Sequence, residues 1–276
     1  MIRKIIILLT ALIIFSAQQS MAQLNNHANI EKNSAISLNV SSNSIDLSAS
    51  DNDKLQSCKG YIELRVAGTE KWSEDFSTKI EVIEKKASGI KIRYVFRDAL
   101  VDAAINKIEG NKLEFSGTIK NTSSSTIQLA RFHYLDGTIK DTASLFLGMS
   151  GKLVNSKDEI LPLRPETEKI WSGLNVFWPR LQEPISDQKN WAVSTDVGFL
   201  LRGWRSKGWL IGYFGPGVAF GEIGFRTKTI EPRFFSAVLL DNIVMEPNET
   251  RVLEKFIVAY GDWQNNLNDW VVKCAQ

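Results

Sequence analysis

The sequence predicts an all-β fold, a large antiparallel β-sandwich (a supersandwich) with a short C-terminal helix. Apolar and polar residues alternate in most segments, with the period of a strand that has one dry face. Turns rich in Gly, Asn and Ser separate many of these segments. With one exception, no internal segment has the spacing of a helix longer than one turn. About a dozen strands without intervening helices are expected to pack as antiparallel sheets stacked face to face.

The first 22 residues have the pattern of a secretory signal. Arg3 and Lys4 precede an apolar run from Ile5 to Phe15, and small residues follow it. The run is too short to cross a bilayer core of about 30 Å as a helix. We therefore expect cleavage after Ala22, a secreted or periplasmic location, and no membrane attachment after cleavage. A signal of this style is typical of bacteria.

Cleavage removes two positive charges, so the formal net charge falls from +2 to 0. A neutral chain is a poor partner for nucleic acid. The sequence then divides into a flexible leader at 23–34, a sandwich at 35–260 and a linker helix at 261–276. Export permits a disulfide, but the sequence does not decide whether Cys58 and Cys274 are bonded.

The strands are taken in chain order. Two short alternating patches at 35–40 and 45–49 predict edge strands, and "GIKIRYVFRD" and "KLEFSGTIKN" show the clearest alternation. The segment "LVDAAINKIEG" is the exception, since it fits a short helix as well as a strand and turn. Further strands are expected at 61–67, 79–84, 127–135, 145–154, 197–201, 209–214, 219–226, 233–240 and 251–260.

The last segment differs in kind from the others. Asp262 is a good N-cap residue, and the spacing after it predicts an amphipathic helix. The stripe on one face of this helix consists of Trp263, Leu267, Trp270, Val271 and Cys274. A helix with two tryptophans on its apolar face must dock, either on the sandwich or on another domain.

Three stretches carry a family resemblance: "KLEFSGTIKNTSSSTIQLARFHYLDG", "GWLIGYFGPGVAFGEIGF" and "LDNIVMEPNETRVLEKFIVAYGDWQNNLNDW". They resemble the N-terminal β-supersandwich that precedes the catalytic barrel in secreted α-galactosidase-type enzymes of glycoside hydrolase family 36. In this order they are similar to its strand, Asn-turn, strand unit, its central hairpin, and its closing strand and linker helix. Asn248-Glu249 stands where the family has a Gly-Glu turn, and Asn also tolerates a left-handed backbone.

The resemblance implies an accessory domain without catalytic residues, cofactor or metal, because the two catalytic Asp residues of such enzymes lie in a barrel of about 250 residues. It implies two partners, a galactoside or related glycan and a catalytic barrel that packs on Trp263, Leu267 and Trp270. The tryptophan stripe would then be exposed in this chain alone. One alternative is a free-standing carbohydrate-binding module, with the helix packed and two tryptophans exposed on one concave face. The other is a surface structural protein.

Catalytic patterns within the chain are weak. Mutarotase chemistry needs a carboxylate and an imidazole around a sugar ring, but the only histidines are His27 in the leader and His133 in a strand, where we expect a structural role. Asp196 and Glu222 lie among aromatic residues and would suit glycoside hydrolysis, but acids at strand edges are usually solvated. No metal-ligand spacing, nucleophile elbow or phosphate loop is present.

Tryptophan is concentrated in one part of the sequence. Five of the eight tryptophans fall between Trp171 and Trp209. A pyranose ring stacks on indole beside polar groups, and "NVFWPRLQ" and "GWRSKGW" have the Pro and polar residues of loops. We therefore predict sugar contacts at Trp178, Arg202, Trp204 and Trp209. Burial in the core is the alternative for each of these tryptophans.

Overall fold

The computed structural model describes a large part of the 276-residue chain. The described residues are 36–49, 53–139, 143–147, 152–154, 160–162, 192–195, 197–202, 207–214, 220–226 and 233–274. The expected signal segment and leader lie outside these residues, as do His27, Trp178, Asp196 and Trp204.

The described strands form two antiparallel sheets, so the predicted all-β sandwich is confirmed. The eight-stranded sheet has the order β1-β2-β3-β9-β17-β16-β13, and β4 pairs with β3. Its strands are β1 (Ser37–Val40), β2 (Ile45–Ser48), β3 (Lys54–Val66), β4 (Ser73–Phe76), β9 (Ile127–Ile139), β13 (Ala192–Thr195), β16 (Phe220–Arg226) and β17 (Arg233–Met245).

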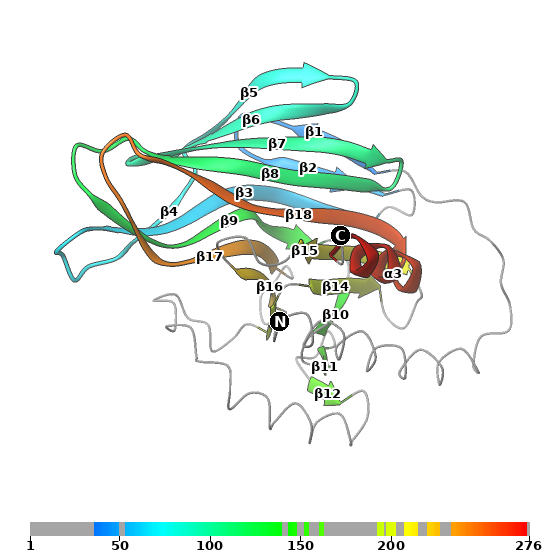
Figure 1. Ribbon diagram of the computed structural model, residues 1–276. Helices are drawn as coiled ribbons and strands as arrows, with labels where there is room; N and C mark the ends of the chain where they lie inside the picture. Colours follow the sequence, from blue (N-terminus) through cyan, green and yellow to red (C-terminus); the bar gives the residue numbers. More distant parts are fainter. Residues whose placement is uncertain are drawn as a thin grey trace, which may run out of the picture.

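The ten-stranded sheet has the order β12-β11-β10-β14-β15-β18-β8-β7-β6-β5. Its strands are β5 (Lys79–Lys86), β6 (Gly89–Val95), β7 (Ala99–Glu109), β8 (Lys112–Asn121), β10 (Ala143–Leu147), β11 (Lys152–Val154), β12 (Ile160–Pro162), β14 (Val197–Arg202), β15 (Lys207–Tyr213) and β18 (Thr250–Asp262). Figure 1 shows this sheet stacked on the other, with β5–β8 and β18 over β3 and β9.

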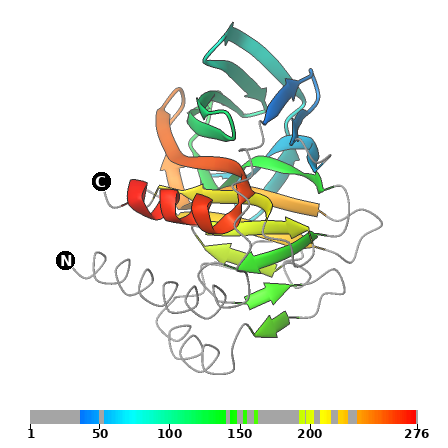
Figure 2. The ribbon, with the colours of Figure 1, turned by 90° about the vertical axis from the view of Figure 1, so that its right-hand side faces the viewer.

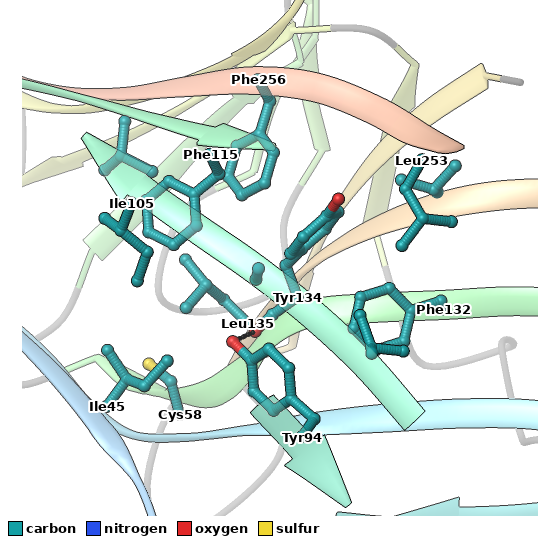
Figure 3. Packing of buried hydrophobic residues seen from close by; sticks show 14 of the residues in the cluster. Ile45, Cys58, Tyr94, Ile105, Phe115, Phe132, Tyr134, Leu135, Leu253 and Phe256 are labelled. Atoms are coloured by element: carbon teal, nitrogen blue, oxygen red, sulfur yellow. Dashed lines mark hydrogen bonds between the residues drawn. The ribbon is translucent and has the colours of Figure 1, made fainter. Parts of the chain in front are cut away.

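The core lies between the two sheets and is rich in aromatic side chains (Figure 3). Phe115 of β8 stacks on Phe256 of β18 with ring centroids 4.6 Å apart. The Tyr94 hydroxyl, from the ten-stranded sheet, donates a hydrogen bond of 2.8 Å to the backbone oxygen of Tyr134 in the eight-stranded sheet. Direct bonds of this kind, with the apolar packing around them, hold the two layers together.

Two expectations for single segments change. The segment 100–110, which fits a helix or a strand and turn, belongs to strand β7 (Ala99–Glu109) and the turn after it, and alternate residues of β7 are buried on one side. The segment 145–154, expected as one strand, contains β10 and β11. These pair antiparallel with Leu147 opposite Lys152, so the chain reverses between them.

The segment expected to form a central hairpin, which contains β15 and β16, does not form one. Strand β15 pairs with β14 and β18 in the ten-stranded sheet, whereas β16 pairs with β13 and β17 in the eight-stranded sheet. The connection between them therefore crosses from one layer to the other. The chain crosses layers again after β8, where the buried Asn121 side chain accepts from the backbone N–H of Ser123 at 2.9 Å and donates to the backbone oxygens of Ser125 and Met245.

The predicted C-terminal helix is present as α3 (Trp263–Cys274), beginning where the sequence indicates. The Asp262 carboxylate accepts a hydrogen bond of 3.0 Å from the backbone N–H of Asn265, which is N-cap geometry. Figures 1 and 2 show α3, in red, lying along β15 and β18. The helix therefore docks on the sandwich of its own chain.

This docking corrects the expectation of an exposed stripe that waits for a catalytic barrel. Leu267 is 1% exposed and packs with Leu210, Ile257 and Ala259. The Trp270 indole N–H donates a hydrogen bond of 3.0 Å to the backbone oxygen of Tyr213. The Trp263 backbone begins the helix, but its side chain is not described. Leu267 and Trp270 are thus engaged within this chain.

Both cysteines are free thiols. Cys58 is buried in the core, and burial raises its pKa well above the ordinary value, so it stays protonated. In the described part of the chain, no helix is long and apolar enough to span a bilayer.

Candidate functional site

The predicted tryptophan and arginine contacts do not form a described site. Trp178 and Trp204 are outside the described residues, and Arg202 ends β14 opposite Ala143 with its side chain not described. Trp209 is described, and it is 1% exposed and packs edge-on against Tyr260 inside the sandwich. It therefore has no free face for a sugar, and the prediction for Trp209 is corrected to a core role.

A different set of polar residues gathers on the eight-stranded sheet. In β9, Phe132 and Tyr134 point into the sandwich, where they contact Tyr94 and Phe115. Because successive strand residues face opposite sides, Arg131 and His133 point to the outer face of this sheet.

Strand register brings residues of the neighbouring strands to the same face. Tyr61 of β3 lies opposite His133, and Glu63 lies opposite Arg131. Ala237 of β17 lies between His133 and Glu222 of β16. Directly paired residues share a face of an antiparallel sheet. We call this group the outer-face cluster; it consists of Tyr61, Glu63, Arg131, His133, Asp136, Glu222, Arg233 and Phe235.

Charged members of the cluster are buried in pairs. Glu222 is 9% exposed, and its Oε2 lies 3.0 Å from Nη2 of Arg131. Arg131 also lies over the Phe235 ring, 5.9 Å from its centroid. The Tyr61 hydroxyl donates to Oε1 of Glu63 at 3.1 Å. Removing charges from water is costly, so such a set is maintained only when its members pair with one another or with a ligand.

His133 occupies the centre of the cluster. Its ring lies between Tyr61 and Phe235, with centroids 4.6 Å and 4.5 Å away. Its Nδ1 lies 3.0 Å from Oδ2 of Asp136, whose other oxygen pairs with Arg233. Its Nε2 is buried and has no hydrogen-bond partner among the residues that the structure describes. The Nε2 atom of His133 is therefore an unsatisfied polar atom at the centre of the cluster, and Oε2 of Glu222, although an ion-pair partner of Arg131, also makes no hydrogen bond with the described residues.

Burial shifts two pKa values in the cluster in opposite directions. It raises the pKa of Glu222, and Glu63 adds to this effect while the Arg131 charge counteracts it. It lowers the pKa of His133, against the opposing effect of its Asp136 partner. The imidazole of His133 is therefore neutral at pH 7, and the Glu222 carboxyl protonates more readily than an exposed one.

The sequence prediction missed most of this cluster. Glu222 was expected to be solvated as an acid at a strand edge, and the structure corrects this: β16 lies between β13 and β17, and the acid is buried in contact with Arg131. Glu63, Arg131 and Asp136 were not singled out. The available signal was "ARFHYLD", in which polar Arg131 and His133 alternate with aromatic residues. Across the described residues, no group of His, Cys, Asp or Glu is placed to hold a metal ion.

The fold and cluster define an all-β sandwich with a polar, aromatic face, and comparison with known proteins adds the following. No family model matches the chain, and no curated protein does. Among solved structures, the galactosidase domain of an alpha-galactosidase-sucrose kinase matches with 12% identity and a TM-score of 0.45, covering 73% of this chain and 30% of that chain.

Two further solved structures show a comparable degree of similarity. A GH36 alpha-galactosidase from Geobacillus stearothermophilus, in complex with raffinose, matches with 10% identity and a TM-score of 0.43, covering 74% of this chain and 32% of its own. An alpha-N-acetylgalactosaminidase from Bifidobacterium bifidum, in complex with GalNAc, matches with 9% identity and a TM-score of 0.46, covering 87% of this chain and 38% of its own. The chain thus spans about a third of the length of these structures.

GH36 alpha-galactosidases, the family that the strand and turn motifs resemble, are therefore among the solved structures with a similar fold.

Proposed function

We propose that the chain is a carbohydrate-binding domain, without a hydrolytic centre of its own, that binds a galactoside or related glycan at the outer-face cluster. We further propose that it is the accessory part of a secreted α-galactosidase-type glycoside hydrolase. The observation that supports sugar binding is the cluster itself, in which charged hydrogen-bonding groups and aromatic rings share one face with an unsatisfied imidazole nitrogen.

This combination of groups suits a sugar. Hydroxyl groups of a pyranose both donate and accept hydrogen bonds, and Arg131, Glu222 and His133 offer both roles within one face. Tyr61 and Phe235 flank the His133 ring, so aromatic side chains border these hydrogen-bonding groups. A few polar groups set among aromatic residues are typical of small-ligand sites.

The ion pairs favour binding over hydrolysis. Glycoside hydrolysis uses two carboxyl groups that act on the substrate from opposite sides. Here Glu222 pairs with Arg131, and Asp136 pairs with Arg233 and His133. Both carboxyl groups are paired with basic residues of the protein, which favours hydrogen bonding to a ligand over acid–base chemistry on a substrate.

A calorimetric titration tests the proposal. Residues 23–276 are titrated with raffinose, stachyose, galactobiose and a glucan, and at least one should give saturable heat. Glu222→Gln should weaken binding about tenfold, the effect of one charge-assisted hydrogen bond. Glu81→Gln is the matched control, because Glu81 is an exposed partner of Lys79 on the other sheet. Absence of heat with every sugar contradicts the proposal, and so does turnover of a nitrophenyl galactoside by the purified chain.

A second candidate is the free-standing carbohydrate-binding module, and the docked α3 favours it. Leu267 and Trp270 already bury against β15 and β18, so they are not reserved for a catalytic barrel. Sedimentation distinguishes the two candidates. A soluble monomer that binds sugar without a second chain supports the module, whereas a chain that is soluble only together with a barrel supports the accessory domain.

Export is also proposed, from the sequence pattern of residues 1–22. Expression of the full chain in a bacterial host should give a protein whose mass lacks these residues and whose first residue is Gln23. Recovery of an uncleaved chain in the cytoplasm would contradict export.

A further inference from the structure

The strongest unexplained feature of the outer-face cluster is the Nε2 atom of His133. The residue is 4% exposed, and this atom has no hydrogen-bond partner among the described residues. A buried polar atom without a partner costs about 1–3 kcal/mol. The other contacts of the His133 ring are with Asp136, Tyr61 and Phe235, and they indicate what Nε2 can do.

A chain of contacts determines which ring nitrogen carries the proton. Arg233 pairs with Oδ1 of Asp136, and Oδ2 of Asp136 lies 3.0 Å from Nδ1 of His133. An ionised carboxylate can only accept hydrogen bonds, so Nδ1 of the neutral imidazole must be the donor. The second nitrogen, Nε2, is then left with a lone pair and acts as an acceptor.

The ring is also fixed in orientation. Phe235 stacks on one face of the imidazole at an interplanar angle of 20°, and Tyr61 lies at 46° against it. The position of Nε2 therefore follows from three neighbouring strands, β3, β9 and β17, and not from a loop. A group held in this way is pre-organised for a partner.

We propose that Asp136 is a positioning residue that holds His133 in the Nδ1–H tautomer, so that Nε2 accepts a hydrogen bond from a hydroxyl group of the bound sugar. The proposal rests on the proposed function, because it uses the same site. It adds one specific contact with the ligand. It also restricts the ligand, since the group that contacts Nε2 must be a hydrogen-bond donor.

The charges around the ring restrict the ligand further. Among the described residues, the titratable and charged groups around His133 are Tyr61 and Glu63 from β3, with Glu74 of β4 beside Tyr61, Arg131 and Asp136 from β9, Arg233 from β17 and Glu222 from β16. Within this described set, two guanidinium groups face four carboxyl groups, so positive charge is not in surplus. A carboxylate on the ligand would bring neither a proton for Nε2 nor a favourable charge. A neutral sugar is therefore preferred to the matching uronic acid.

Nitrogen NMR of the imidazole tests the tautomer directly, without a ligand. The chain has two histidines, so a His27→Gln variant labelled with ¹⁵N-histidine reports on His133 alone. The Nε2 shift should be that of an unprotonated acceptor and should move towards the protonated value when a binding sugar is added. A protonated Nε2 in the free protein overturns the proposal, and so does an Nε2 shift that sugar leaves unchanged.

Substitution tests the positioning role. Asp136→Asn should give a mixture of the two tautomers and weaken sugar binding about tenfold, the effect of losing one hydrogen bond. Asp102→Asn, which alters the Arg93–Asp102 pair on the other sheet, should leave the tautomer of His133 and the affinity for sugar unchanged. An Asp136→Asn protein that keeps the tautomer and the affinity contradicts the proposal. If this variant does not fold, the nitrogen spectrum of the His27→Gln protein still tests the tautomer of His133 and the response of Nε2 to sugar.

Matched ligands separate this inference from the proposed function. Galactose should bind at least tenfold more tightly than galacturonic acid at about pH 7. Tighter binding of the acid overturns the inference and leaves sugar binding intact. No binding of any sugar overturns the proposed function, while the NMR experiment on the free protein still tests the tautomer.

Discussion

His133 and Glu222 are buried on the same face of one sheet, and their contributions to stability depend on pH in opposite ways. The pKa of His133 is lower in the folded chain than in the unfolded chain. Its contribution to stability is therefore present at pH values above the pKa of the unfolded chain and is lost as the pH falls. The pKa of Glu222 is raised, so its contribution is present at low pH and is lost as the pH rises. Both effects follow from desolvation.

We expect a pH-dependent loss of stability that is specific to His133. As the pH falls from about 7.5 to about 5, the unfolded chain takes up a proton on this residue more readily than the folded chain. The wild-type free energy of unfolding should therefore fall relative to that of His133→Gln, which cannot titrate. Urea unfolding across this range measures the difference.

The control for this experiment is the second histidine. A His27→Gln variant should keep the pH dependence of the wild type, because it retains His133. Parallel pH profiles for the wild type and His133→Gln would show that the imidazole is not buried in its neutral form.

Gly212 provides a second prediction for a single residue. A Cβ atom at this position would lie 2.6 Å from the Trp270 ring, so Gly212→Ala should displace the indole from β15. Overpacking of this kind costs about 1–3 kcal/mol. Thermal unfolding and a change in tryptophan emission measure the effect. Gly110→Ala is the matched control, because a Cβ there meets no atom within 4 Å and stability should hardly change.

The sequence predicted few residues of the outer-face cluster, and the reason is physical. Alternation shows that Arg131 and His133 share a face, but not whether this face is wet or buried. Only strand register brings Glu63 and Glu222 to them, and register depends on pairing between distant segments. The prediction of a sugar contact at Trp209 was wrong for a related reason, since an indole ring packs in a core as well as it stacks on a sugar.

At the scale of the element, α3 shows what local sequence can and cannot determine. Its start at Asp262 and its apolar stripe were predicted from capping and periodicity, which are local. The surface that the stripe covers was not predicted, because it is formed by β15 and β18 together. Segment 100–110 could not be assigned from the sequence for a similar reason, since pairing of β7 with β6 and β8 makes it a strand.

Removal of the N-cap should destabilise α3 in a graded way. Asp262→Ala leaves the backbone N–H of Asn265 without its acceptor and should cost about 1 kcal/mol of stability. Asp262→Asn keeps a capping oxygen and should cost much less. Chemical unfolding of the two variants makes the comparison, and equal losses would show that the cap does not act through this hydrogen bond.

At the scale of the whole molecule, the two sheets share one core and should unfold together. Phe132 and Tyr134 of one sheet contact Tyr94 and Phe115 of the other, so neither layer keeps its apolar face covered alone. We therefore expect a single cooperative transition in urea, with far-ultraviolet circular dichroism and tryptophan emission giving the same midpoint. Separate midpoints for the two signals would indicate layers that unfold independently.

The layered architecture was predictable from the sequence, but the order of strands was not. Strand periodicity and turn residues indicate stacked antiparallel sheets. They do not indicate that β15 and β16 belong to different layers, because both read as ordinary strands joined by a glycine-rich link. Which strands become neighbours is decided by the shared core and not by any one segment.

The position of β18 determines when the molecule can assemble. This late strand lies between β8 and β15 in the ten-stranded sheet, so both strands keep an open edge until the ribosome has released residues up to Asp262. Pairings between such distant segments make folding slow, and open edges invite association with other chains. A nascent chain that stays unfolded for this long has time to engage a chaperone before its sheet closes.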